Sequence, residues 1–140
     1  MKTLVIFYSY TGDTKAIAQQ LAEKDSLDIV EIQDIDRPGS IKAYTVGCYY
    51  AMLGRSWPIH PLSVDLETYD HYILLAPVWA GRIPPAMSAV LENLPEGKTA
   101  DVKMVSASGK SSCQERLETI FKEKGGSLES FEDINSKTQK

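Results

Sequence analysis

Leu4-Val5-Ile6-Phe7-Tyr8 leads directly into Ser9-Tyr10-Thr11-Gly12-Asp13-Thr14, and this stretch decides the fold. The apolar run is typical of a strand that is buried on both faces of a parallel sheet. From residue 14 to residue 24 the apolar side chains recur at helical spacing, with polar residues between them. The stretch therefore predicts a buried strand, then a polar turn that contains one glycine, then the start of a helix.

The turn between these two elements is rich in groups that bind phosphate. Ser9, Thr11 and Thr14 supply hydroxyl donors, and Gly12 lets the backbone approach a ligand closely because it has no Cβ atom. The start of the next helix adds N–H groups and the positive end of the helix dipole. An ordinary helix cap needs only one such side chain. We therefore interpret residues 9–14 as a phosphate-binding turn.

Composition limits the kind of protein this chain can be. Its 140 residues are 43% hydrophobic, enough for one core, and the net charge of −4 argues against nucleic acid and anionic membranes as partners. The two cysteines, Cys48 and Cys113, make no disulfide framework, and no apolar run is long enough to span a bilayer. We expect a cytoplasmic protein with one domain at 1–134 and a flexible tail at 135–140.

Five β-favouring runs alternate with four helix-like segments along the chain. The strands are predicted at 3–8, 27–33, 72–76, 102–107 and 127–133. This alternation predicts a doubly wound α/β fold, in which helices cover both faces of a parallel sheet. The second and fifth runs are the most polar and belong at the edges, so the predicted strand order is 2-1-3-4-5. In that order the turn at 9–14 and the loops at 77–83 and 106–110 meet at the switch point where ligands bind.

A helix is predicted over residues 41–53, with Gly54 as its natural stop. Its apolar residues occupy more than one side, which indicates deep burial or a partner surface, and deep burial is the commoner cause. We expect this helix to run back from the ligand-binding edge of the sheet. Trp57, His60 and His71 would then lie at the opposite edge, as structural or surface residues.

These motifs resemble those of short-chain flavodoxins. Residues 9–14 are similar to the phosphate loop of that family, in which a hydroxyl residue and any residue precede Thr-Gly-any-Thr. Pro77-Val78-Trp79-Ala80-Gly81 resembles the loop that packs a tryptophan against the flavin ring. The succession of elements matches over nearly the whole chain. The resemblance implies a flavodoxin-like fold, FMN as the cofactor and electron transfer as the activity.

The resemblance also implies a role for each residue at the predicted switch point. The FMN phosphate would accept hydrogen bonds from the three hydroxyls of the turn and from its N–H groups, while Asp13 points outward and caps the helix. Trp79, expected to be exposed, would stack on the isoalloxazine ring. The implied cofactor-binding residues are Ser9, Tyr10, Thr11, Gly12, Asp13, Thr14, Pro77, Val78, Trp79, Ala80, Gly81, Arg82, Ser106, Ala107, Ser108 and Gly109.

Three features of the sequence bear on what this resemblance implies about the flavin. The family commonly has glycine directly after the tryptophan, where a peptide can flip toward the reduced flavin, but this chain has Ala80. The loop at 106–110 lacks the aromatic residue that often covers the other face of the flavin, so that face would be open to a substrate or a nicotinamide. Arg82 either makes the reduction potential less negative than in strongly acidic flavodoxins or is a solvated loop arginine.

The sequence leaves more than one function open. The first hypothesis is an FMN-dependent carrier that moves electrons between a reductase and acceptor proteins, with no catalytic side chain and no metal. The alternative is an enzyme that uses FMN and NAD(P)H to reduce quinones or similar small acceptors. A flavin-free binding module with Tyr49 and Tyr50 as contacts is the third. We expect a monomer or weak homodimer, and a Cys113 that serves packing or, with its pKa lowered by a helix dipole, a redox role.

Overall fold

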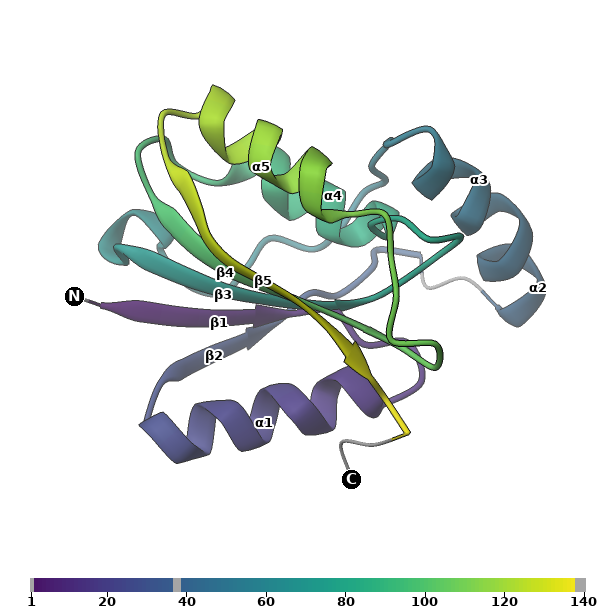
Figure 1. The fold of residues 1–140 in the computed structure, drawn as a ribbon, viewed down its shortest axis with the longest axis horizontal. Coiled ribbons are helices and arrows are strands. Elements are labelled where there is room, and N and C mark those ends of the chain that lie inside the picture. The colour runs from purple at the N-terminus through teal and green to yellow at the C-terminus, as the bar shows by residue number, and fades with distance from the viewer. Residues whose placement is uncertain (1, 37–38, 138–140) are drawn as a thin grey trace.

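The chain folds into one parallel sheet of five strands with the order β2-β1-β3-β4-β5, which confirms the predicted topology (Figure 1). The computed structural model describes residues 2–36 and 39–137. The strands are β1 (Thr3–Phe7), β2 (Asp28–Glu31), β3 (His71–Pro77), β4 (Thr99–Ser106) and β5 (Ser127–Asn135). All neighbouring strands pair in parallel, so their carboxyl ends, marked by the arrowheads, lie at one edge of the sheet.

Helices cover both faces of the sheet, but unequally (Figure 1). The helix α1 (Asp13–Asp25) lies on one face by itself. The other face carries α4 (Pro85–Asn93), α5 (Gln114–Glu123) and a continuous helical run made of α2 (Ser40–Lys42), a π-helical stretch (Ala43–Gly47) and α3 (Cys48–Met52). A 3₁₀ turn at Leu66–Thr68 precedes β3. Within the described ranges, no helix is both long enough and apolar enough to cross a bilayer.

The core is divided by the sheet into two layers, as the alternation of side chains in a strand requires. Val5 and Phe7 of β1 pack on the α1 side, against Ala18 and Ala22. The alternate residues of β1 join the larger layer beneath α4 and α5, with Tyr72 and Leu74 of β3. Because β1 and β3 are buried on both faces, they fix the centre of the sheet and hold its carboxyl edge in place.

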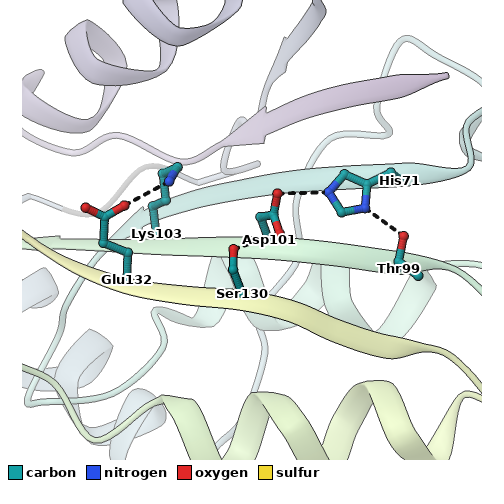
Figure 2. A network of polar contacts seen from close by, with 6 residues as sticks. All are labelled: His71, Thr99, Asp101, Lys103, Ser130 and Glu132. Carbon is teal, nitrogen blue, oxygen red and sulfur yellow. Dashed lines mark hydrogen bonds and ion pairs between the residues drawn. The ribbon is translucent and has the colours of Figure 1, made fainter. Parts of the chain in front are cut away.

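On the α1 side, β3, β4 and β5 carry polar side chains that form a network (Figure 2). The His71 ring lies 2.6 Å from the Thr99 hydroxyl through Nδ1 and 3.0 Å from the Asp101 carboxylate through Nε2. The Ser130 hydroxyl donates to the same carboxylate at 2.7 Å, and Lys103 Nζ donates to Glu132 at 2.9 Å. This network lies on the part of the sheet face that α1 does not cover. There the polar side chains bond to one another instead of packing against a second helix.

The last strand is longer than the predicted range of 127–133 and contains an irregularity. Ala100 pairs with Leu128 but Asp101 pairs with Ser130, so β5 has one extra residue, Glu129, at a β-bulge. The strand also reaches Asn135, and the N–H group of the next residue, Ser136, donates to the Ser106 carbonyl at 2.8 Å. The start of the predicted tail at 135–140 is therefore held to the sheet. Residues 138–140 of that tail lie outside the described residues.

The network makes a prediction about stability in acid. Burial by itself raises the pKa of Asp101, but hydrogen bonds from Ser130 and His71 and the charges of His71 and Lys103 outweigh it and lower the pKa. A carboxyl pKa lowered by folding stabilises the native state above about pH 4, and the stabilisation is lost as the pH falls through the native pKa. We expect Ser130→Ala to raise the native Asp101 pKa toward its unfolded value, so that the variant loses less stability than the parent as the pH falls below about 4.

The measurement is a carboxyl ¹³C NMR titration, paired with urea unfolding across the acid range. Ser127→Ala is the matched control, because it removes an exposed hydroxyl of the same strand without touching Asp101. An Asp101 pKa that is the same in both variants would contradict the assignment.

Candidate functional site

The three loops singled out in the sequence lie together at the carboxyl edge of the sheet. The rings of Tyr10 and Trp79 meet edge to face with centroids 5.7 Å apart, which joins the turn at 9–14 to the loop after β3. The N–H group of Ser112 donates to the Gly81 carbonyl at 2.8 Å, which joins the loop after β3 to the loop after β4. Helix starts and strand ends thus surround one region, as the strand order requires.

Ser9 organises the first loop. Its side chain is 7% exposed, and its oxygen accepts hydrogen bonds from the N–H groups of Gly12 at 3.1 Å and Lys15 at 3.2 Å. Both acceptor positions of the hydroxyl are used, so its hydrogen remains able to donate to a ligand. Gly12, with φ of +102°, is the residue before the helix, and a Cβ built there would meet nothing within 4 Å. The glycine is needed for its backbone conformation, not for space.

Thr14 adds a further hydroxyl donor to this loop. Its side chain is only 2% exposed, yet its hydroxyl forms no hydrogen bond with any other described residue. The N–H groups of Asp13 and Thr14 also have no acceptor in the described part of the chain, as expected for the first turn of a helix. Three donors at this helix start are thus left for an outside acceptor.

Asp13 does not cap the helix, contrary to the prediction. The helix begins at Asp13 itself, and no side chain caps it. The carboxylate is exposed and lies 3.5 Å from the Thr11 hydroxyl, which is too long for a strong hydrogen bond. Both side chains are on the outside of the loop, where Thr11 can still turn toward a ligand.

Trp79 is 8% exposed, so the expectation of an exposed loop tryptophan is wrong. Its ring makes edge contacts with Tyr8, Tyr10 and Trp57, with centroids 5.9, 5.7 and 5.9 Å away. We call these four side chains the aromatic cluster. Stacking on a flavin stays a prediction for Trp79, and any flavin would meet a ring that the protein already holds in place.

Trp57 belongs to this cluster and therefore lies at the carboxyl edge, not at the opposite edge as predicted. Its indole N–H donates to Asp34 Oδ1 at 2.9 Å, and the Tyr8 hydroxyl donates to Asp34 Oδ2 at 2.8 Å. Asp34 is 9% exposed, and no pattern in the sequence singled it out. His71, at the start of β3, does lie at the amino edge, where we expected it.

The helical run over 40–52 explains the position of Trp57, because it crosses the carboxyl edge (Figure 1). A Cβ at Gly47 would lie 2.6 Å from Cζ3 of Trp79, so only glycine allows the helix to pass this close to the ring. A glycine inside a helical pattern is the sequence signal that could have indicated this contact. Deep burial of the helix was a wrong expectation, since its outer side exposes Ile41 (82%), Tyr49 (59%) and Met52 (62%).

A cavity of about 300 Å³ opens between this helical run and two of the loops. We call it the edge cavity. Its lining residues are Tyr10, Ser40, Ala43, Cys48, Val78, Trp79 and Ala80. The volume is at the lower end of the range for small-molecule sites. Sequence reasoning identified the loop residues of this lining but missed Ser40, Ala43 and Cys48, because it placed their helix elsewhere.

Ala80 and Gly81 form a two-residue turn with positive φ at both positions, +51° and +76°. The Trp79 N–H group donates to the Arg82 carbonyl at 3.0 Å, and the Arg82 N–H group donates to the Trp79 carbonyl at 2.9 Å. These two hydrogen bonds close the turn. This is a type I′ turn, in which a residue other than glycine is strained. The side chain of Arg82 leads away from the edge cavity and lines a different one, beside α5.

In the third loop, at 106–110, two serine side chains accept hydrogen bonds from the backbone of the loop itself. Ser106 Oγ accepts from the Gly109 N–H group at 3.0 Å, and Ser108 Oγ accepts from the Lys110 N–H group at 3.3 Å. Ala107 and Ser108 are exposed, and Pro77 and Val78 of the neighbouring loop are half-buried. The loop therefore presents small polar groups and no ring toward the edge.

Cys113 is not a helix-activated thiol. It is the residue before α5, it is 1% exposed, and its thiol lies 3.7 Å from the Gly81 carbonyl as a weak donor. Burial raises the pKa of this thiol, which opposes the lowering expected from the helix dipole. The prediction of a lowered pKa was wrong because burial outweighs the dipole, and the residue serves packing.

Comparison with solved structures shows what this architecture is similar to. A flavoprotein from Lactobacillus acidophilus NCFM, solved in complex with FMN, has a TM-score of 0.75 at 19% identity, covering 93% of this chain and 91% of that one. A protein from Bacteroides eggerthii DSM 20697, provisionally described as a flavoprotein, has a TM-score of 0.77 at 19% identity over 96% and 88%. A flavodoxin from the domain Archaea has 0.57 at 14% identity over 94% and 82%.

These likenesses show the fold class: the chain has a flavodoxin-like fold. No protein-family model matches the chain, and no curated protein matches it. At identities this low, the arrangement of the elements is shared while most side chains differ. What the site does must therefore be argued from its own residues.

The strained turn makes a prediction about stability. Because a left-handed backbone costs an ordinary residue about 1–2 kcal/mol, we expect Ala80→Gly to stabilise the protein by about 1 kcal/mol despite the greater freedom of glycine in the unfolded chain. Urea unfolding measures the difference. Ala107→Gly is the matched control, since Ala107 is exposed in a neighbouring loop and has no positive φ, and it should be neutral or destabilising. A less stable Ala80→Gly protein would contradict the argument.

Proposed function

We propose that the carboxyl edge binds FMN and that the protein carries electrons between a reductase and acceptor proteins. The observation that carries the proposal is Thr14, a buried residue whose hydroxyl forms no hydrogen bond with another described residue, in a loop whose helix start also leaves N–H groups without an acceptor among the described residues. Such an array of donors fits a phosphate dianion. FMN combines a phosphate with a flat ring, and the site offers features suited to both.

The phosphate end would be held by donors without a cation inside the turn. The hydroxyls of Ser9, Thr11 and Thr14 and the N–H groups of the first helical turn would donate to it. Each hydrogen bond to a charged group contributes about 1.5–3 kcal/mol. Ser9 would have a second role besides donating to the phosphate, because the two hydrogen bonds that its oxygen accepts fix the conformation of the loop.

The ring end would occupy the edge cavity, beside Trp79 and Ala80. Trp79 supplies an aromatic wall that is fixed by the aromatic cluster, so little rotamer freedom is lost when a flat ligand packs on it. When bound, FMN supplies the electron transfer itself. The task of the chain is then to bind the flavin, orient its ring and limit its contact with water.

A carrier role is supported by the surface around the edge cavity. Ile41, Tyr49 and Met52 of the helical run are all more than half exposed, and Ser40, Ala43 and Cys48 of the same run line the cavity. An exposed apolar patch beside a redox group suits brief contact with another protein. The small-acceptor enzyme remains the competing hypothesis, because the third loop presents no ring to cover the flavin.

FMN binding is tested by titrating the flavin into purified apoprotein and following the quenching of flavin fluorescence. We expect one saturable site, and we expect Thr14→Val to weaken it about tenfold to a hundredfold, because one hydrogen bond to a charged group is lost. Thr119→Val is the matched control, since Thr119 donates only within α5, to the Glu115 carbonyl. Equal affinity of the two variants would overturn the phosphate assignment.

The carrier role is tested with the flavin-loaded protein. We expect no steady oxidation of NADPH with a quinone when the protein is the only catalyst, and rapid reduction of the bound flavin when a flavin-dependent NADPH reductase is added. The control replaces the loaded protein by free FMN at equal concentration. Steady turnover without the reductase would favour the enzyme over the carrier.

A further inference from the structure

A second cavity lies apart from the edge cavity and shares no lining residue with it. Its volume is about 90 Å³, and it lies open to solvent between the end of α3, the start of α4 and the start of α5. The polar side chains on its wall are those of Arg82, Ser88, Ser112 and Arg116. One water needs roughly 10–15 Å³ measured in this way, so the space admits a group of several heavy atoms.

Both arginines are exposed residues that line this cavity, and neither has a carboxylate partner among the described residues. In the described part of the chain, neither Arg82 nor Arg116 forms an ion pair, although the sequence has 19 acidic residues against 15 Lys and Arg. Lys15 and Lys103, by contrast, pair with Glu31 and Glu132. Two guanidinium groups on one wall, neither of them ion-paired with a described residue, suit this cavity to an anion.

The guanidinium group of Arg116 lies close to Gly54, where a side chain would crowd it. A Cβ built at Gly54 would lie 3.1, 3.2 and 3.3 Å from Nη2, Cζ and Nε of Arg116. These similar distances mean that the flat side of the guanidinium rests on the Gly54 backbone. The N–H groups around the rim of the guanidinium are then left to donate, in the forked geometry that matches an oxyanion.

Ser88 adds a hydroxyl group to the cavity wall. Its side chain is 9% exposed, and its hydroxyl forms no hydrogen bond with any described residue, although it lies on the cavity wall. No buried side-chain oxygen among the described residues lacks a hydrogen-bond partner, so the Ser88 oxygen is reached by solvent from the cavity. Its own N–H group is satisfied by the Pro84 carbonyl at 3.0 Å, so only the side chain is left open.

No carboxylate lines this cavity, although Glu92 and Glu123 line an adjoining cavity that shares Gly54, Ser88 and Arg116 with it. The Cys113 thiol also lines the cavity, and burial raises its pKa, so it stays neutral. The nearby Asp133 carboxylate is not part of the lining, and it accepts a hydrogen bond from the Ser111 hydroxyl at 2.6 Å. The wall therefore offers donors and positive charge, with apolar contacts from Met52 and Ile83.

We propose that this cavity is a binding site for a small oxyanion, held by Arg82, Arg116 and Ser88. The shared chemistry is that of a phosphate or sulfate, either as the free ion or as the terminal group of an organic ester. Met52, which is 62% exposed at the rim, would contact the organic part of an ester.

The test is a titration of ¹⁵N-labelled protein with inorganic phosphate, sulfate and phenyl phosphate at constant ionic strength, each with and without FMN. We expect saturable shifts of Arg82 and Arg116 Nε–H signals and of Gly54, unchanged by FMN. Tighter binding of phenyl phosphate than of the free ions would assign the site to an ester, and equal binding would assign it to the free ion.

Variants complete the test. Arg116→Gln and Ser88→Ala should each weaken phosphate binding at least tenfold, whereas Lys122→Gln, which removes a charge from the same helix away from the cavity, should not. Thr14→Val should also leave it unchanged, which separates this site from the turn at 9–14. The proposal is overturned if no anion gives saturable shifts, if FMN abolishes them, or if Lys122→Gln weakens binding as much as Arg116→Gln.

Discussion

The contact of Trp79 with three other aromatic rings is the interaction on which the carboxyl edge depends. Tyr8 comes from the end of β1, Tyr10 from the turn after it, and Trp57 from the segment after the helical run. Three distant parts of the sequence, at residues 8–10, 57 and 79, are thereby joined at one point. Edge-to-face pairs of this kind add about 0.5–1.5 kcal/mol each beyond the apolar area that they bury.

Asp34 and Gly47 make this cluster possible. Asp34 accepts from both Tyr8 and Trp57, so the polar ends of two rings are satisfied inside the molecule. Gly47 removes the side chain that would collide with Trp79. The helix can therefore pass over the indole, and the edge cavity forms between them. The geometry of the edge cavity thus depends on the Asp34 carboxylate and on the absence of a Cβ atom at Gly47.

Much of the fold could be predicted, because it depends on patterns that are local in the sequence. The continuous apolar runs of β1 and β3 and the polar residues of β2 and β5 determine the strand order directly. The turn at 9–14 was also recognisable, since hydroxyls, a glycine and a helix start are adjacent in the chain. These features need no knowledge of distant contacts.

The rest of the site could not be predicted, because it depends on contacts between residues far apart in sequence. The apolar residues on several sides of 41–53 indicated burial, but the helix lies at the edge of the sheet and leaves Ile41 and Tyr49 exposed. The wrong position predicted for Trp57 followed from the wrong position predicted for this helix. For Cys113, the helix dipole suggested a reactive thiol, whereas the burial that raises its pKa comes from packing that the sequence does not reveal.

The bulge in β5 has a consequence for the behaviour of the molecule at high concentration. An edge strand offers free N–H and carbonyl groups to which a strand of another molecule can add, and this addition is a common start of aggregation. The extra residue Glu129 interrupts the regular spacing of β5, and exposed Glu132 adds a second charge. At the other edge, β2 has only four residues. Neither border of the sheet is therefore a good template for growth into fibrils.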